Sequence, residues 1–158
     1  MTGLSYSVWQ SPIGPLTLCG SERGLVSLLF GRHVPKDAKE DARATAECRR
    51  QLEEYFAGER REFDLPLDLR GTEFQLRCWR ALLKIPYGET RTYAQQAKAV
   101  GCPRGFRAVG LANHDNPIAI VVPCHRVINT GGKLGGYGGG LDLKARLLRL
   151  ERGQGTLV

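Results

Sequence analysis

The sequence lacks the features of membrane-spanning and secreted proteins. No apolar run approaches the roughly 20 residues that cross a bilayer, and residues 1–10 have neither the basic start nor the apolar stretch of a secretory signal. Hydrophobic residues make up 42% and charged residues 25%, which is the balance of a soluble globular chain. We therefore expect a cytoplasmic protein with no membrane partner.

Cysteine pairs at disulfide or zinc spacing are also missing. The five cysteines are an odd number, and no two stand at Cys-x-x-Cys spacing. In a cytosolic chain this argues against a disulfide framework and a structural zinc site. A zinc set made of Cys102, His114, Cys124 and His125 has poor spacing, so we expect no metal. Each cysteine is then either a small buried apolar side chain or a reactive thiol.

Acidic residues are the scarcer charge. Lys and Arg number 23 against 16 Asp and Glu, which gives a net charge of +7. Such a balance favours a polyanionic partner such as nucleic acid, but many basic proteins bind no DNA. Whether the net charge indicates a DNA partner depends on where the basic side chains lie.

The first part of the chain has the patterns of strands. Short apolar runs at residues 4–9, 16–19 and 25–30, with a turn cluster at 11–15, predict a small antiparallel sheet. Residues 38–56 predict a helix. We expect residues 1–70 to form an N-terminal α/β support lobe without a catalytic constellation.

Residues 71–158 predict a helical lobe. Thr72 and Thr92 are expected to cap the first two helices. The helical patterns cover residues 73–84, 92–99, 104–113 and 141–151. The second and third, with a glycine turn between them, make the outline of a helix-turn-helix, although plain helical hairpins share that outline. The expected fold class is α+β, with a winged-helix-like C-terminal lobe that carries the helix-turn-helix.

Two further segments flank a candidate nucleophile. Residues 118–122 are all apolar and predict a buried strand or extended segment, and residues 131–140 contain seven glycines. Between them, Pro123 fixes the backbone before Cys124, His125 supplies an adjacent base, and Arg126 adds a charge that favours the thiolate. From the Cys-His pair alone, an inert buried cysteine is the more common outcome.

The string Ile-Val-Val-Pro-Cys-His-Arg-Val-Ile at residues 120–128 resembles the active-site signature of the O6-alkylguanine-DNA alkyltransferase family. Its Pro-Cys-His-Arg core is highly specific, and the resemblance extends over residues 71–152. It implies direct reversal of DNA damage by an irreversible, single-turnover methyltransferase. The alkyl group of O6-alkylguanine or O4-alkylthymine in double-stranded DNA would pass to the protein after base flipping, without a cofactor.

The resemblance implies catalytic roles for five residues. Cys124 would accept the alkyl group, His125 would take the thiol proton through a water, and Glu151 would orient His125. Asn116 would brace the active-site segment and the turn of the helix-turn-helix. Tyr93 would help rotate the 3′ phosphate and protonate the leaving guanine.

The resemblance also implies a minor-groove interface. Arg107 would enter the duplex where the damaged base leaves, and Arg104 and Arg91 would contact the DNA beside it. The small Ala108 and Gly110 would let their helix lie close to the groove, although small residues pack equally well against a protein core.

The base pocket follows from the same resemblance. Tyr137 would line it, and Pro123 and Gly138 would belong to its wall. The carbonyls of Val122 and Cys124 would read the guanine amino group.

Three rival functions stay open. One is a binder of alkylated DNA that performs no repair, against which Cys124 argues directly. The others are a helix-turn-helix regulator with a structural Pro-Cys-His-Arg string and a cysteine hydrolase. We expect a monomer, with cooperative assembly on DNA left open.

Overall fold

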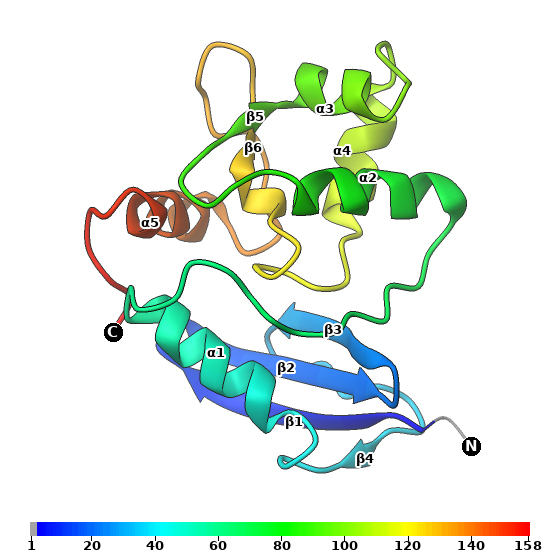
Figure 1. Cartoon of the computed structure of the whole chain (residues 1–158), viewed down its shortest axis with the longest axis vertical. Helices are drawn as coiled ribbons and strands as arrows, with labels where there is room; N and C mark the ends of the chain where they lie inside the picture. Colours follow the sequence, from blue (N-terminus) through cyan, green and yellow to red (C-terminus); the bar gives the residue numbers. More distant parts are fainter. Residues whose placement is uncertain (1–2) are drawn as a thin grey trace.

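The computed structural model describes residues 3–158 as two lobes, with the N-terminal sheet below the C-terminal helices in the view of Figure 1. The first lobe holds β1 Ser5–Ser11, β2 Gly14–Ser21, β3 Gly24–Phe30, β4 Lys39–Glu40 and α1 Ala46–Phe56. The second holds α2 Glu73–Leu83, β5 Arg91–Thr92, α3 Tyr93–Ala99, α4 Phe106–His114, the short 3-10 helix η1 Cys124–Arg126, β6 Val127–Ile128 and α5 Leu141–Glu151. The expected α+β class is confirmed. Within residues 3–158, no helix has the length and apolar character to cross a membrane.

The N-terminal sheet is mixed, whereas an antiparallel sheet was expected. Its strand order is β3-β2-β1-β4, and β4 runs parallel to β1. The residues that form β4 were expected to lie in a helix from residue 38, but α1 begins at Ala46. The backbone N–H groups of Lys39 and Asp41 instead donate to the carbonyls of Leu4 and Tyr6 at 2.9 and 2.8 Å. Pairing with a free strand edge outweighs the weak helical preference of these residues.

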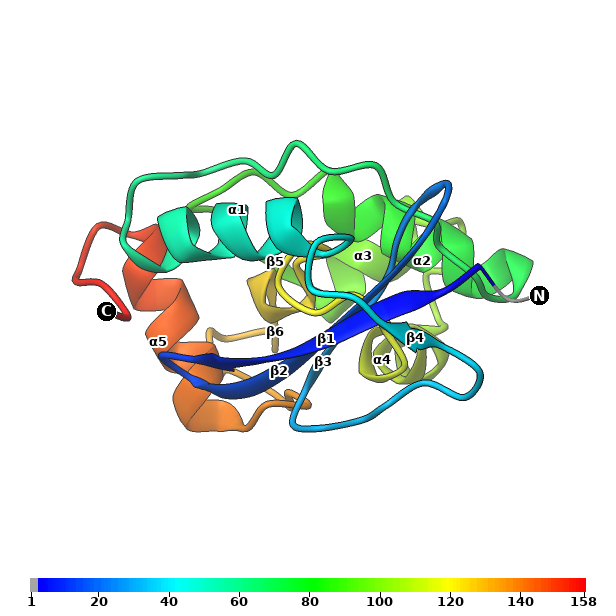
Figure 2. The same cartoon turned by 90° about the horizontal axis from the view of Figure 1, so that it is seen from below.

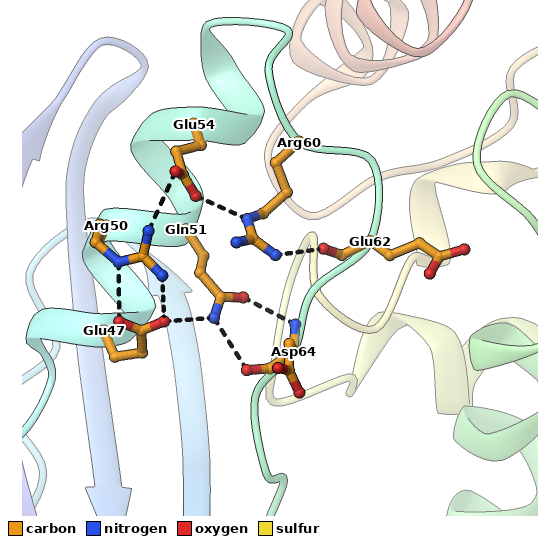
Figure 3. Close-up of polar contacts among 7 residues, drawn as sticks. All are labelled: Glu47, Arg50, Gln51, Glu54, Arg60, Glu62 and Asp64. Carbon is orange, nitrogen blue, oxygen red and sulfur yellow. Dashed lines mark hydrogen bonds and ion pairs between the residues drawn. The ribbon is translucent and has the colours of Figure 1, made fainter.

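Helix α1 packs against the sheet, and the segment that follows it is fastened to it (Figures 2 and 3). The ring centroids of Trp9 and Phe56 are 6.1 Å apart. The buried Gln51 side chain donates to the carbonyl of Asp64 and accepts from its N–H, both at 2.9 Å. These bonds hold the segment around Asp64 against α1. The same helix carries the buried Tyr55.

Capping explains where α2 and α3 begin. The hydroxyls of Thr72 and Thr92 each accept from the backbone N–H three residues on, and the glutamines there reach back to complete capping boxes. Both expected N-caps are therefore confirmed. Helix α4 begins at Phe106 rather than residue 104, so Arg104 lies in the turn before it.

The segment at residues 118–122 is buried, but it is not a strand. It makes successive turns, and Ile120 adopts a positive φ of 71°. Its one bridge joins Ile118 to Leu28, whose N–H donates to the Pro117 carbonyl at 2.8 Å and whose carbonyl accepts from Ala119 at 3.0 Å. Strand β3 of the N-terminal lobe therefore supports the chain that leads to Cys124, and its pairing overrides the extended pattern.

Candidate active site

Cys124 begins η1 and lies on the wall of a small pocket of about 140 Å³. The other lining residues come from α3, α4 and the glycine loop: Tyr93, Gly110, Asn113, His114, Gly136, Tyr137 and Gly138. The structure thus brings Tyr93, Tyr137 and Gly138 to Cys124, as the sequence predicted. Val122 and Pro123 are buried and do not line this pocket.

The Cys124 thiol rests in its protonated form. Burial raises its pKa, and the opposing effects of a hydrogen bond from Asn116 and the charge of Lys144 do not cancel that rise. Because the thiolate is the nucleophile, the site needs a base to remove the proton. Arg126 was expected to favour the thiolate, but its guanidinium is engaged elsewhere.

The predicted base, His125, follows Cys124 directly in the chain. Its Nε2 lies 2.7 Å from Glu151 Oε2, and both side chains are almost fully buried. An ionised carboxylate only accepts hydrogen bonds, so Nε2 carries a hydrogen, and in the tautomer with its hydrogen on Nε2 the lone pair that a base requires lies on Nδ1. This Nδ1 is buried and has no hydrogen-bond partner within residues 3–158. The predicted proximity of Glu151 to His125, 26 residues apart, is confirmed.

Glu151 is the centre of a buried cluster that joins both lobes. Arg126 Nε donates to Oε1 at 2.7 Å, Arg126 Nη2 donates to Oε2 at 3.0 Å, and the Tyr55 hydroxyl donates to Oε2 at 2.5 Å. Burial raises the pKa of Glu151, but the charges and hydrogen bonds of His125 and Arg126 outweigh it and bring that pKa to about 2. The carboxylate is therefore ionised at neutral pH.

Asn116 braces the active-site segment from within. Its side-chain amide donates to the Val122 carbonyl at 2.8 Å and accepts from the Ile118 N–H at 3.0 Å. The N–H of Cys124 donates to the same Val122 carbonyl at 2.8 Å. Both acceptor sites of that carbonyl are therefore occupied, which leaves the Cys124 carbonyl as the better candidate to read a guanine amino group.

Two tyrosines flank the thiol. Burial and the neighbouring Cys124 raise the pKa of Tyr93 and of Tyr137, so both phenols stay protonated and can donate. The Tyr137 hydroxyl is buried and without a hydrogen-bond partner within residues 3–158. Its ring meets Phe30 of β3 edge to face, with centroids 5.7 Å apart.

The exposed face of α4 opens on a second, larger hollow of about 720 Å³. The hollow is lined by residues of α3, α4 and the segment that enters the glycine loop: Tyr93, Ala94, Phe106, Arg107, Gly110, Asn129, Thr130, Gly135 and Gly136. Ala108 is exposed on the same helix, whereas Ala112 faces the core and its carbonyl accepts from Trp79 Nε1 at 2.8 Å.

The remaining predicted DNA contacts are not gathered with Arg107. Arg104 is exposed in the turn before α4. Arg91 pairs with Glu89 at 3.1 Å and lines a different hollow, between α2 and α3, with Arg77, Arg80 and Lys84. Among residues 3–158, no group of three or more His, Cys, Asp or Glu side chains has the arrangement of a metal site.

Comparison with known proteins decides the family. Residues 4–69 match the model described as "6-O-methylguanine DNA methyltransferase, ribonuclease-like domain" and residues 73–153 match its "DNA binding domain". The chain belongs to the 6-O-methylguanine DNA methyltransferase family.

Relatives and solved structures agree with this assignment. The methylated-DNA--protein-cysteine methyltransferase of Mycolicibacterium paratuberculosis is 56% identical, covering 94% of this chain and 93% of the relative. That of Methanosarcina acetivorans is 54% identical, covering 92% and 97%. A crystal structure of Mycobacterium tuberculosis OGT in complex with DNA superposes with a TM-score of 0.91 at 52% identity, covering 96% and 95%. The predicted family, enzyme class and DNA binding are confirmed, while the roles of single residues stay predictions.

Three features of this methyltransferase site were not found from the sequence. Tyr55 and Arg126 hold Glu151, and the fully buried Lys144 of α5 binds carbonyls of the glycine loop and β6. Lys144 Nζ donates to Val127 at 2.6 Å, to Gly136 at 3.2 Å and to Leu134. Burial lowers its pKa to about 8. Only the helical period of α5, which puts position 144 beside Leu147 and Leu148, hinted at its burial.

A further pair was also missed. Gln96 of α3 and Asn113 of α4 exchange two buried side-chain hydrogen bonds of 2.9 and 2.7 Å. This amide pair therefore joins the two helices of the helix-turn-helix. Asn116, which was predicted to brace that turn as well, bonds to the active-site segment instead.

Proposed function

We propose that this protein repairs double-stranded DNA by one irreversible transfer of the alkyl group of O6-alkylguanine, or of O4-alkylthymine, to its own Cys124. One observation carries the proposal. The Cys124 thiol lies on a pocket wall, and the adjacent His125 has its Nε2 held by Glu151 and its Nδ1 free to accept a proton. This is the arrangement of a nucleophile, a base and a group that orients the base.

The chemistry balances without a further reactant. His125 Nδ1 takes the thiol proton through a bridging water, and the sulfur attacks the alkyl carbon. A C–S bond forms, the C–O6 bond breaks, and its electron pair stays on guanine. Tyr93 donates a proton to the guanine, and the proton on His125 makes good the loss from the phenol. The thioether has no leaving group that the site can activate, so each protein molecule repairs one lesion.

The helix-turn-helix supplies the access that this chemistry requires. An alkylated base inside the stack is out of reach and has to be flipped out, at a cost of a few kcal/mol. We propose that α4 lies in the minor groove, that Arg107 fills the vacated position and that Arg104 contacts a phosphate, since both arginines are exposed. Arg91, on a separate surface, would contact a more distant phosphate.

The organisation of the molecule completes the proposal. Residues 1–70 form the supporting domain, and residues 71–158 form the domain that binds DNA and accepts the alkyl group. Strand β3, which holds the segment before Cys124, and Tyr55, which holds Glu151, are the contacts through which the support acts. The protein works as a cytoplasmic monomer and uses no cofactor.

The test is the mass of the intact protein after incubation with duplex DNA that contains O6-methylguanine. We expect one added methyl group on Cys124, and a plateau at one equivalent when the lesion is in tenfold excess. Cys124→Ser should gain no methyl and should still bind DNA, because binding draws on backbone and arginine contacts. Turnover beyond one equivalent, or loss of O6-methylguanine with Cys124→Ser, would overturn the proposal.

A further inference from the structure

The N-terminal end of α4 carries an exposed aromatic side chain next to Arg107 in the chain. Phe106 is 52% exposed, and Leu111 on the same helix is 62% exposed. Among residues 3–158, Phe106 is the aromatic member of the exposed large apolar side chains. A partly exposed aromatic side chain forgoes part of the free energy of its burial, which a partner that covers it would recover.

The position of Phe106 ties it to the lesion pocket. Phe106 and Arg107 line the hollow of about 720 Å³, and Tyr93, Gly110 and Gly136 line both this hollow and the pocket of Cys124. Along α4, Phe106, Gly110 and His114 stand four residues apart and so share one face. Phe106 marks the outer end of that row, and His114 lies at the end next to Cys124.

The surroundings of Phe106 identify the occupant as DNA. Arg107 follows it in the chain and lines the same hollow, Arg104 stands two residues before it, and both arginines are exposed, so this end of α4 is basic as well as apolar. The hollow belongs wholly to residues 73–153, which match the DNA binding domain of the family. Proteins that bind the minor groove combine cations with apolar side chains that wedge against base steps.

We propose that Phe106 is a second wedge beside Arg107, which contacts the base step next to the position that the flipped nucleotide leaves. The proposal rests on the proposed function. Arg107 would supply charge and fill the vacated position, whereas Phe106 would supply a neutral stacking surface that keeps the neighbouring base pair from closing the gap. Phe106 is thus a specificity and positioning residue for duplex substrates, and it has no part in the transfer itself.

The deciding experiment measures affinity for a duplex that contains O6-methylguanine at several salt concentrations. Phe106→Ala should raise the Kd about tenfold, as expected for the loss of one aromatic stacking contact. It should leave the slope of log K against log [salt] unchanged, because no phosphate contact is lost. Arg104→Ala should lower that slope by about 0.9, which separates the two kinds of contact. Leu83→Ala, which truncates an exposed apolar side chain of α2, is the matched control and should change neither quantity.

A second readout tests the wedge itself. With 2-aminopurine next to the lesion, the parent protein should raise its fluorescence on binding, and Phe106→Ala should raise it less. The double variant with Arg107→Ala should show a non-additive loss, since neighbours that act on one step are coupled. Phe106→Leu should retain part of the affinity. Reaction with free O6-methylguanine base should be the same for Phe106→Ala and the parent, because nothing has to be flipped.

The outcomes separate this inference from the proposed function. If the parent protein gains no methyl from any substrate, the proposed function is wrong, whatever Phe106 does. If the parent is methylated and Phe106→Ala binds the duplex with the parent's Kd, the wedge is wrong. Equal losses on the duplex and on the free base would also overturn the wedge, because Phe106 would then support the pocket or the fold.

Discussion

The cluster around Glu151 and the exposed face of α4 differ in burial and in how their polar groups are paired. In the cluster, Glu151 is 4% exposed and every oxygen of its carboxylate meets a donor from His125, Arg126 or Tyr55. On α4, Arg107, Phe106 and Leu111 lie in solvent. The chemical machinery is thus assembled before DNA arrives, which avoids reorganisation at the moment of reaction. The binding surface is left to be completed by the substrate.

Among the substitutions considered, Glu151→Gln should have the largest effect on both alkyl transfer and stability. The change leaves the buried Arg126 without its carboxylate and removes the charge that stabilises a protonated His125. We expect alkyl transfer to slow by roughly 10²-fold or more, and the free energy of unfolding to fall by about 3–5 kcal/mol. Single-turnover kinetics and denaturant unfolding measure the two effects. A folded variant that reacts at the parent rate would exclude the relay.

Lowering the pH should remove the stabilisation that the Glu151 cluster provides, without affecting the exposed face of α4. The folded-state pKa of Glu151, about 2, lies below its ordinary value of 4.5, so its ionised form stabilises the fold. That stabilisation is complete above pH 4.5 and is lost as the pH falls from 4.5 towards 2, by an amount on the order of 3 kcal/mol. Glu151→Gln should lack this part of the acid transition. Identical pH profiles for the parent and the variant would contradict the assignment.

Arg107→Ala probes the other side of the comparison. Repair of a lesion within a duplex should slow by roughly 10- to 100-fold, because part of the flipping cost of a few kcal/mol is no longer offset. Reaction with the free base should change little, and so should the melting temperature, since the side chain is exposed. Equal losses on both substrates would mean that Arg107 supports the pocket.

Lys144→Met tests whether the glycine loop is as preorganised as the relay. Three carbonyls would lose their shared donor, and we expect a loss of about 2 kcal/mol of stability and transfer about tenfold slower on duplex and free base alike. Lys133→Met, an exposed lysine of the same loop, is the matched control and should behave as the parent does. Parent-like rates for Lys144→Met would show that the loop holds its shape without the lysine.

Tyr55→Phe should give the smallest effect. It removes one of the hydrogen bonds to Glu151 and leaves those of Arg126 and His125, so we expect a loss of about 1 kcal/mol with a rate within a few-fold of the parent's. Urea unfolding and single-turnover kinetics are sufficient. A loss as large as that of Glu151→Gln would make Tyr55, and with it the N-terminal lobe, a principal support of the relay.

Local pattern by itself determined much of this protein. The apolar runs gave the three long strands, the two threonine caps gave the starts of α2 and α3, and the period of α5 gave its bounds. These succeed because each depends on neighbours within about four residues. The Pro-Cys-His-Arg string indicated the family to which the chain belongs.

Only the tertiary structure decided the rest. Tyr55 meets Glu151 across 96 residues, and Lys144 meets Val127 across 17. The apolar pattern of residues 118–122 predicted an extended segment. In the structure this segment bridges to β3, makes successive turns and has a positive φ at Ile120. The sequence predicted that Arg126 would favour the thiolate of Cys124. In the structure α5 brings Glu151 to Arg126, and the guanidinium pairs with that carboxylate. Partner choice of this kind depends on which elements pack together, and spacing along the chain carries no record of it.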